Sequence, residues 1–260
     1  MDWIDLGRAA LRYDLTGSGP DTLVLIHEMG GTLDSWDQVL PILNRDRLVL
    51  RYDTRGAGQS EKLRGAITFD DMADDLAALL DALPIAGPVS LVGCAVGGAI
   101  ALRFAGRYRA RVASLIVMSP ATGIAADRRD ATLARIAAFE ADGPRGAVEA
   151  SFAASFPPVM RHDMAQFRRF RARWLANDPA SYATIYRMLV NSDFTDELKR
   201  IACPTLVIAG THDLARPPAV VAEVARAIPG ARLQTIESGH FMAVQTPGLV
   251  ADAILRFLKE

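Results

Sequence analysis

The sequence of 260 residues lacks several features that mark particular classes of protein. Two cysteines, Cys94 and Cys203, are too few for a disulfide framework or a cluster of cysteine metal ligands. The formal net charge is -1, whereas proteins that bind a phosphate backbone usually carry a clustered basic surface. The nearest approach to a basic run is RRFRARW at residues 168–174, a pattern typical of a solvated helix face. We therefore expect no nucleic-acid partner.

Targeting and membrane segments are also missing from the sequence. The first residues, MDWIDLGRAALRYDL, show no basic stretch followed by an apolar run, so they predict no secretory signal. Charged residues interrupt every apolar run before it reaches the roughly 18 residues that a membrane span needs. These absences predict a reduced, soluble, cytoplasmic protein with no membrane partner. Half of the residues are hydrophobic, enough for one large core, so we expect a single domain over residues 1–260.

Short apolar runs recur along the chain with helical patterns between them. The runs cover residues 9–16, 22–26, 47–52, 89–93, 112–119, 205–209 and 232–236. Several are continuously apolar, such as LVLI and SLIVM, which is typical of strands covered on both faces. Residues 69–83 carry apolar residues at helical spacing after a candidate N-cap at Thr68. The alternation predicts an α/β fold with a mainly parallel, doubly wound sheet, started by an antiparallel hairpin over residues 3–16.

Strand signals disappear between residues 120 and 200, where helical patterns take over. Two sets of apolar residues at helical spacing, separated by Gly143-Pro144, indicate helices: Leu133, Ile136, Ala137 and Phe139, then Met164, Phe167, Phe170 and Trp174. This block lies between two expected core strands. We therefore expect a core made of residues 1–119 and 201–260, with an inserted helical cap at about residues 120–200.

The stretch from Gly93 to Gly97, GCAVG, follows a strand and opens a helix, which is the context of a nucleophile elbow. Small residues on either side of the centre permit a sharp turn that presents the central side chain at the carboxyl edge of the sheet. The central residue is Ala95, so the turn has no hydroxyl. The glycine spacing is not G-x-G-x-x-G and no acidic residue follows at the required distance, which argues against a dinucleotide site.

Two further motifs complete a candidate catalytic arrangement. Asp213 and His240 each follow a strand, in the chain order nucleophile position, acid, histidine. Asp213 would orient the imidazole and leave its other nitrogen free to take a proton. The HEMGG motif follows another strand and would supply the backbone N–H of Met29, which with that of Val96 would form an oxyanion hole. His27 and Arg55 are expected to anchor loops.

With these motifs, the chain resembles α/β-hydrolase-fold proteins, and among them the 3-oxoadipate enol-lactonases. The segments RYDTRGAGQS, CPTLVIAGTHDLARPP and IPGARLQTIESGHFMAVQTPG match that family's pattern, and the resemblance covers nearly the whole chain. It implies an eight-stranded sheet and a pocket between cap and sheet. It also implies a small carboxylic ester, lactone or other activated carbonyl substrate, from aromatic catabolism if the chemistry is shared. It implies no metal or organic cofactor, and a homodimer stays open.

The departures from that family's pattern lie around the same site. The family's elbow usually reads G-x-S-x-G with a histidine before the serine, where this chain has Cys94 and Ala95. The usual R-G-H-G loop has Ala57, and Glu28 stands where a glycine usually follows the first histidine. Cys94 is a further candidate nucleophile, but we expect it to face away from the pocket because adjacent strand residues point in opposite directions. Glu28 is a candidate acid or water-orienting group, or a member of a surface ion pair.

Three interpretations of Ala95 stay open. In the first, which the several departures favour, alanine is native and His240 with Asp213 activates a water; a lyase that uses the same histidine is a variant. In the second, an ordinary Ser-His-Asp lactonase or esterase has been inactivated by a Ser to Ala change. In the third, the chain is a ligand-binding module without catalysis, although such a module has no need of the acid and histidine pair.

Overall fold

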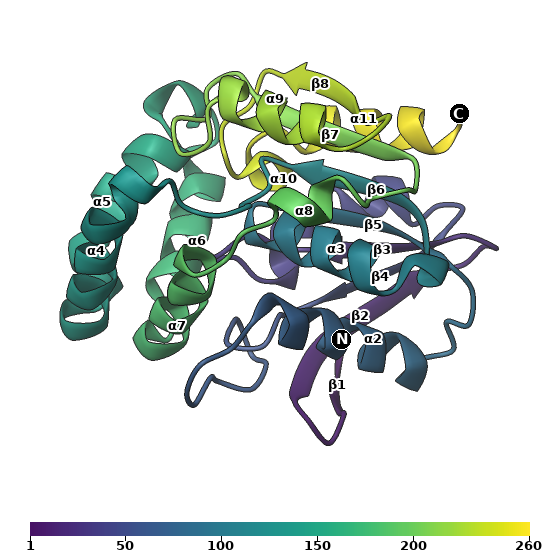
Figure 1. The fold of residues 1–260 in the computed structure, drawn as a ribbon, viewed down its shortest axis with the longest axis horizontal. Helices are drawn as coiled ribbons and strands as arrows, with labels where there is room; N and C mark the ends of the chain where they lie inside the picture. Colours follow the sequence, from purple (N-terminus) through teal and green to yellow (C-terminus); the bar gives the residue numbers. More distant parts are fainter.

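The computed structural model describes residues 1–260 and contains one eight-stranded sheet with helices on both faces (Figure 1). The strands run in the order β1-β2-β4-β3-β5-β6-β7-β8, and β2 is antiparallel to both of its neighbours, β1 and β4, whereas all the other neighbouring strands are parallel. Each expected strand is present with ends within one residue of the prediction. The strands are β1 Asp2–Asp5, β2 Ala10–Gly17, β3 Thr22–Ile26, β4 Leu48–Tyr52, β5 Val89–Cys94, β6 Val112–Met118, β7 Thr205–Gly210 and β8 Arg232–Ile236. The predicted α/β fold is confirmed.

The apolar strands are buried because helices cover both faces of the sheet. On β5, Leu91 and Val92 point to opposite faces of the sheet. Leu91 packs into the hydrophobic cluster beneath the helices that begin at Phe69, Val96 and Pro218, whereas Val92 packs into the cluster beneath the helices that begin at Leu40 and Pro247. Burying each such side chain stabilises the fold by about 1.5–3 kcal/mol. The covering helices are α1 Leu40–Leu43, α2 Phe69–Ala82, α3 Val96–Arg107, α9 Pro218–Ala227, α10 Met242–Gln245 and α11 Pro247–Leu258. The continuous apolar runs of the sequence therefore form strands that are covered on both faces, as predicted.

Helix α2 begins where its sequence predicts. The Thr68 side chain accepts from the Asp71 N–H at 3.1 Å, and the Asp71 carboxylate accepts from the Thr68 N–H at 3.0 Å. This reciprocal cap satisfies two backbone donors at the helix start. One acid on this helix, Asp75, is buried and receives the guanidinium groups of Arg8 and Arg55. Arg55 thus ties its loop to α2, as a loop anchor should.

Residues between β6 and β7, called the cap from here on, form the helices α4 Arg129–Asp142, α5 Pro144–Ser155, α6 Met164–Leu175, α7 Pro179–Val190 and α8 Thr195–Leu198. Figure 1 shows α4 to α7 grouped at one end of the sheet, to the left in that view. The two helices predicted from apolar spacing are present as α4 and α6, although two of the apolar residues that indicated them, Leu133 and Met164, are exposed. They lie on the outer faces of α4 and α6, whereas Ile136 and Phe170 on the same helices are buried.

None of the helices combines the length and the apolar composition required to cross a membrane.

Candidate active site

The elbow between β5 and α3 has the backbone strain of a nucleophile turn. Ala95 adopts φ 51° and ψ -113°, a conformation that costs a residue other than glycine about 1–3 kcal/mol. Its N–H donates to the Met118 carbonyl at 2.9 Å, which holds the turn against β6. A Cβ at Gly93 would lie 2.3 Å from the Gly97 carbonyl oxygen, and a Cβ at Gly97 would lie 2.3 Å from that of Ile26. The two glycines are therefore required by the closeness of the backbone, independently of the residue at 95.

Cys94 is placed where it cannot act as a ready nucleophile. The side chain is fully buried, and its thiol donates to the His240 carbonyl oxygen at 3.4 Å. Burial raises the pKa of the Cys94 thiol well above its ordinary value, and the nearby Glu28 and Asp213 charges raise it further. Since the thiolate is the reactive form, this geometry does not favour Cys94 as a substitute nucleophile.

The structure brings the two predicted dyad residues together. His240 Nδ1 lies 2.8 Å from Asp213 Oδ2, and the Arg216 N–H donates to Asp213 Oδ1 at 2.8 Å. A carboxylate accepts, so Nδ1 carries the ring proton and Nε2 is the basic nitrogen. Burial by itself would raise the pKa of Asp213, but the charge and hydrogen bond of His240, with the Arg216 N–H, hold that pKa below its ordinary value. Asp213 can therefore stabilise a protonated imidazole.

Neighbours that sequence reasoning missed support this dyad. Ser119, directly after β6, is fully buried with φ 43°, and its N–H donates to the Ile208 carbonyl on the neighbouring strand β7 at 2.9 Å, while its hydroxyl has no hydrogen-bond partner in the protein. The carbonyls at the end of α5 hold both dyad loops, because Ala154 accepts from the Leu214 N–H at 3.1 Å and Ser155 accepts from the His240 N–H at 3.0 Å. No sequence pattern identifies these contacts, since they join distant segments.

The oxyanion loop after β3 is oriented by His27. The Thr54 N–H donates to His27 Nε2 at 3.0 Å, so Nδ1 carries the proton and donates to the Glu28 carbonyl at 2.7 Å. The Gly31 N–H donates to the same carbonyl at 3.0 Å. A trans peptide is planar, so fixing the Glu28 carbonyl fixes the Met29 N–H in the opposite direction. The Met29 N–H has no protein acceptor, and it is therefore available to a substrate oxygen.

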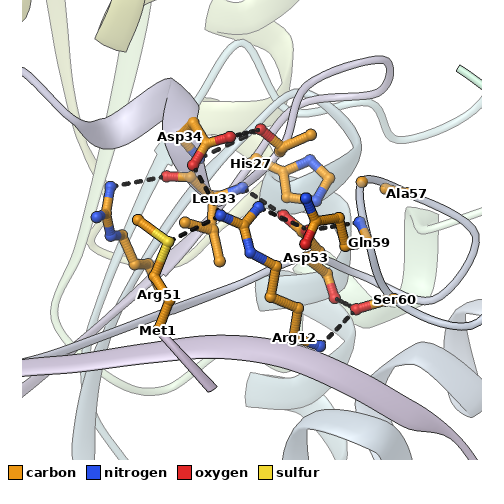
Figure 2. Close-up of polar contacts among 12 residues, drawn as sticks. Met1, Arg12, His27, Leu33, Asp34, Arg51, Asp53, Ala57, Gln59 and Ser60 are labelled. Atoms are coloured by element: carbon orange, nitrogen blue, oxygen red, sulfur yellow. Dashed lines mark hydrogen bonds and ion pairs between the residues drawn. The ribbon is translucent and has the colours of Figure 1, made fainter. Parts of the chain in front are cut away.

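The same loop is tied to the loop after β4 by Asp53, whose carboxylate is completely buried. It accepts from the Leu33 N–H at 2.7 Å and from the Gln59 N–H at 2.8 Å, and Arg12 lies 3.3 Å away (Figure 2). A Cβ at Gly58, which has φ 50°, would lie 2.1 Å from this carboxylate. Asp53 therefore holds both loops by hydrogen bonds from their backbones, and Arg12 on β2 balances its buried charge.

Glu28 is not a surface residue, so its interpretation as a surface ion pair is wrong. Its side chain is buried, and Oε1 accepts from the Ser35 hydroxyl at 2.7 Å. A Cβ at Gly31 would lie 2.1 Å from that oxygen, so the carboxylate fills the inside of the loop. Nowhere in the chain do three or more His, Cys, Asp or Glu side chains gather as a metal site would require.

Met29 and Val96, which carry the two proposed backbone donors, are among the residues that line a narrow cavity, whereas Ala95 and His240 are not. The volume of this cavity is about 10 Å³, and the oxyanion loop, the loop after β4, α2, the start of α3 and the region of α7 surround it. The lining residues are His27, Glu28, Met29, Gly30, Thr54, Gly56, Ala57, Met72, Val96, Asn177, Tyr182 and Ile185. Val96 is the first residue of α3, where backbone N–H groups have no partner inside the helix and favour negative charge.

A larger groove, of about 450 Å³, lies at the opposite edge of the sheet, where Thr22 and Thr205 begin β3 and β7. Ligands of open α/β sheets bind at the carboxyl ends of the strands, which favours the narrow cavity as the substrate site.

The aromatic residues that the cap carries at helical spacing pack against one another and do not line this cavity. Phe167, Phe170 and Trp174 are buried in one aromatic cluster with Phe152 and with Phe241, the neighbour of His240. None of them lines the cavity, whose cap-side wall is formed by Asn177, Tyr182 and Ile185. The Asn177 amide donates to the Gly30 carbonyl at 3.0 Å, so it also joins the cap to the oxyanion loop.

Comparisons with known proteins agree with this geometry. A family model described as alpha/beta hydrolase fold matches residues 21–247. A relative from Pantoea ananatis, RutD, named as a candidate carbamate hydrolase, is 31% identical over 92% of this chain and 88% of its own. The 3-oxoadipate enol-lactonase 2 of Acinetobacter baylyi is 28% identical over 96% of this chain and 93% of its own. The solved enol-lactonase of Burkholderia xenovorans superposes over the full length of both chains with a TM-score of 0.92 at 26% identity. The chain therefore belongs to the α/β-hydrolase fold family and is a hydrolase.

Proposed function

We propose that this hydrolase cleaves small carboxylic esters or lactones with a water nucleophile activated by His240, because its elbow has no serine. The observation that carries the proposal is a complete Asp213–His240 pair, with its 2.8 Å contact, beside an elbow centred on Ala95. A protein that only bound ligands would not need a buried carboxylate that stabilises an imidazolium. The enol-lactonase relatives, and the resemblance in sequence, support the same class of substrate.

The proposed reaction needs no group beyond these residues, the substrate and water. As the water oxygen bonds to the carbonyl carbon, His240 Nε2 takes a proton from the water and the carbonyl electron pair moves to oxygen. The N–H groups of Met29 and Val96 donate hydrogen bonds to the resulting oxyanion and stabilise its negative charge. The tetrahedral intermediate then expels the alcohol oxygen, which takes the proton from His240, leaving a carboxylic acid and an alcohol or an opened lactone. Such general base catalysis contributes about 10²–10⁴-fold, so it suits an activated carbonyl.

One observation favours the second interpretation, an ordinary serine triad enzyme with a Ser to Ala change. Ala95 has a strained backbone conformation. A serine nucleophile needs this conformation to present its hydroxyl at the elbow, whereas an alanine gains nothing from it. The two proposals differ in what a hydroxyl at this position would do.

The experiment compares hydrolysis of activated esters and enol-lactones by the chain, by Ala95→Ser and by His240→Ala. We expect Ala95→Ser to change kcat/KM by no more than about threefold and His240→Ala to lower it by about 10²–10⁴-fold. The matched control is His162→Ala, which removes an exposed cap histidine and should leave the rate unchanged.

Either of two results would overturn the proposal. An increase of several orders of magnitude in Ala95→Ser would identify the ordinary triad. Full activity in His240→Ala would remove the proposed base from the reaction.

A further inference from the structure

We propose that Arg216 binds a carboxylate group of the substrate, so that the preferred esters and lactones are those that carry a negative charge. This inference rests on the proposed function, because it names the class of ester or lactone that His240 would hydrolyse. Arg216 follows β7 in the loop that carries Asp213, and its side chain is half-buried.

Two hydrogen bonds place Arg216 beside the site. Its backbone N–H donates to Asp213 Oδ1 at 2.8 Å, and its Nη2 donates to the Gly123 carbonyl at 2.9 Å. Gly123 belongs to the loop after β6, in which the Ala121 N–H donates to the Ala95 carbonyl at 2.9 Å. The guanidinium group therefore lies between the loop of the dyad acid and the loop that contacts the elbow.

The order of the sheet places this guanidinium group across the elbow from the oxyanion loop. The oxyanion loop follows β3, the elbow follows β5, and the loops of Gly123 and Arg216 follow β6 and β7, which is the order in which these strands lie side by side. A substrate whose carbonyl oxygen contacts the N–H groups of Met29 and Val96 can therefore direct its other end toward Arg216.

Arg216 differs from the other enclosed arginines because its charge has no partner in the protein. All other buried or half-buried arginines except Arg161 form an ion pair with an acid. Arg161 has a different partner, because its guanidinium lies 4.4 Å from the centre of the Phe167 ring, a cation–π contact. Arg216 has neither an acid nor a ring.

An anion from the substrate would supply what Arg216 lacks. Its Nε and Nη1 nitrogens donate to no acceptor in the protein. Burial lowers the pKa of the Arg216 guanidinium, although the Asp213 charge acts in the other direction. The planar guanidinium matches the geometry of a carboxylate, and hydrogen bonds between two charged groups are roughly twice as strong as neutral ones. The same charge would offset the repulsion between a bound carboxylate and Asp213.

The test compares substrates that differ only in charge. One pair is 4-carboxyphenyl acetate and its primary amide, and the other is γ-butyrolactone with either a carboxylate or a primary amide on the γ-carbon. For each pair, the kcat/KM of the anionic member is divided by that of the neutral member. In at least one pair we expect Arg216→Gln to lower this ratio by about 10–100-fold, the usual effect of losing a hydrogen bond to a charged group.

The neutral member of each pair reports whether the variant is folded, because Arg216→Gln should leave its kcat/KM within about threefold of the wild-type value. Arg216→Lys keeps the charge, so its ratio should lie between those of the wild type and Arg216→Gln.

Arg161→Gln is the matched control. Arg161 is also half-buried, forms no ion pair and donates to a backbone carbonyl, that of Phe156, at 2.9 Å. This variant should leave both ratios within about twofold of the wild-type values. Ratios that Arg216→Gln leaves unchanged, or that both variants lower alike, would overturn the proposal. A wild-type chain that favours both neutral compounds by more than hydroxide ion does would also overturn it, without any variant.

Failure of the proposed function would look different. In that case His240→Ala would hydrolyse the neutral compounds as fast as the wild type, or no compound would be hydrolysed. If His240→Ala is inactive while Arg216→Gln leaves both ratios unchanged, the proposed function stands and only the inference about Arg216 fails. If nothing is hydrolysed, calorimetry with 4-carboxyphenyl acetate still tests Arg216: we expect Arg216→Gln to bind it at least about tenfold more weakly, and equal affinities would overturn the proposal.

Discussion

The two halves of the candidate site are held by different parts of the chain. The oxyanion half is fixed mainly from within the core, where His27 and Asp53 bind backbone groups of the loops after β3 and β4, and the cap adds one hydrogen bond from the Asn177 amide to the Gly30 carbonyl. The dyad half is fixed partly by the cap, because the carbonyls of Ala154 and Ser155 at the end of α5 accept from the dyad loops. The comparison teaches that damage to the cap should disturb the position of His240 more than that of the oxyanion donors.

The kinds of contact that hold the two halves also differ. Around the oxyanion loop the contacts are buried hydrogen bonds and ion pairs, which cost much when one partner is lost. Around the dyad, backbone hydrogen bonds to α5 are joined by aromatic packing, with Phe241 packed against both His240 and the cap cluster. Substitutions in each half should therefore produce different combinations of lost activity and lost stability.

The largest effect is expected from Asp53→Asn. The substitution removes one of the two carboxylates that pair with the buried Arg12, leaving only Asp34, and places an amide against two backbone N–H donors. We expect a loss of about 3–5 kcal/mol in the free energy of unfolding and of about 10²-fold in kcat, the usual effect of losing one oxyanion donor. Urea unfolding and ester hydrolysis measure both.

Asp37→Asn is the control for that variant, because Asp37 also binds an arginine but is half exposed. It should cost less than about 1 kcal/mol. If the two variants behaved alike, Asp53 would not be the residue that holds the oxyanion half.

The next largest effect should come from Phe152→Ala in the dyad half. Phe152 is buried on α5 and its ring contacts five others, including Phe241. We expect a loss of about 3–5 kcal/mol, with hydrogen exchange raised in the cap and in the loop that carries His240. Leu133→Ala, at an exposed position on α4, should have little effect. Unchanged hydrogen exchange in the loop that carries His240 would contradict the inference that the cap holds this loop in place.

The smallest effect concerns Glu197, which lies on α8 where the chain returns from the cap to the core. Burial raises the pKa of Glu197 to about 7 despite the attraction of Arg103, whose Nε lies 3.0 Å from the carboxylate. The folded protein then binds a proton between pH 4.5 and 7 that the unfolded chain has lost, so the free energy of unfolding falls as pH rises through this window.

Glu197→Gln is neutral throughout and should remove this dependence, so its melting temperature should exceed that of the wild type by a few degrees at pH 8 and by less at pH 5. The exposed Glu149→Gln should show no such trend. A pH-independent difference between wild type and Glu197→Gln would show that Glu197 does not titrate in this window.

Much of the fold and of the site follows from local patterns. Alternating apolar runs and helical spacings predict the sheet and its order of elements, and Gly93 and Gly97 predict the turn because no larger residue fits there. The dyad is predicted by Asp213 and His240, each placed after a strand, since parallel strands bring their carboxyl ends to one edge.

Residues whose surroundings come from distant segments could not be predicted in this way. Glu28 has the composition of a surface acid, and only the approach of Ser35 and Gly31 encloses it. Phe167 and Phe170 have the spacing of a buried face, but their place in an aromatic cluster, outside the cavity, depends on where Phe152 and Phe241 lie.

The sequence by itself thus determined the α/β fold with its mainly parallel sheet, the missing hydroxyl at Ala95 and the order of the dyad, because each depends on neighbours in the chain or on the regular geometry of a parallel sheet. Only the tertiary structure decided the size and lining of the cavity, the support of the dyad by α5 and the burial of Glu28. These features depend on close packing between segments far apart in the sequence, and no local pattern records it.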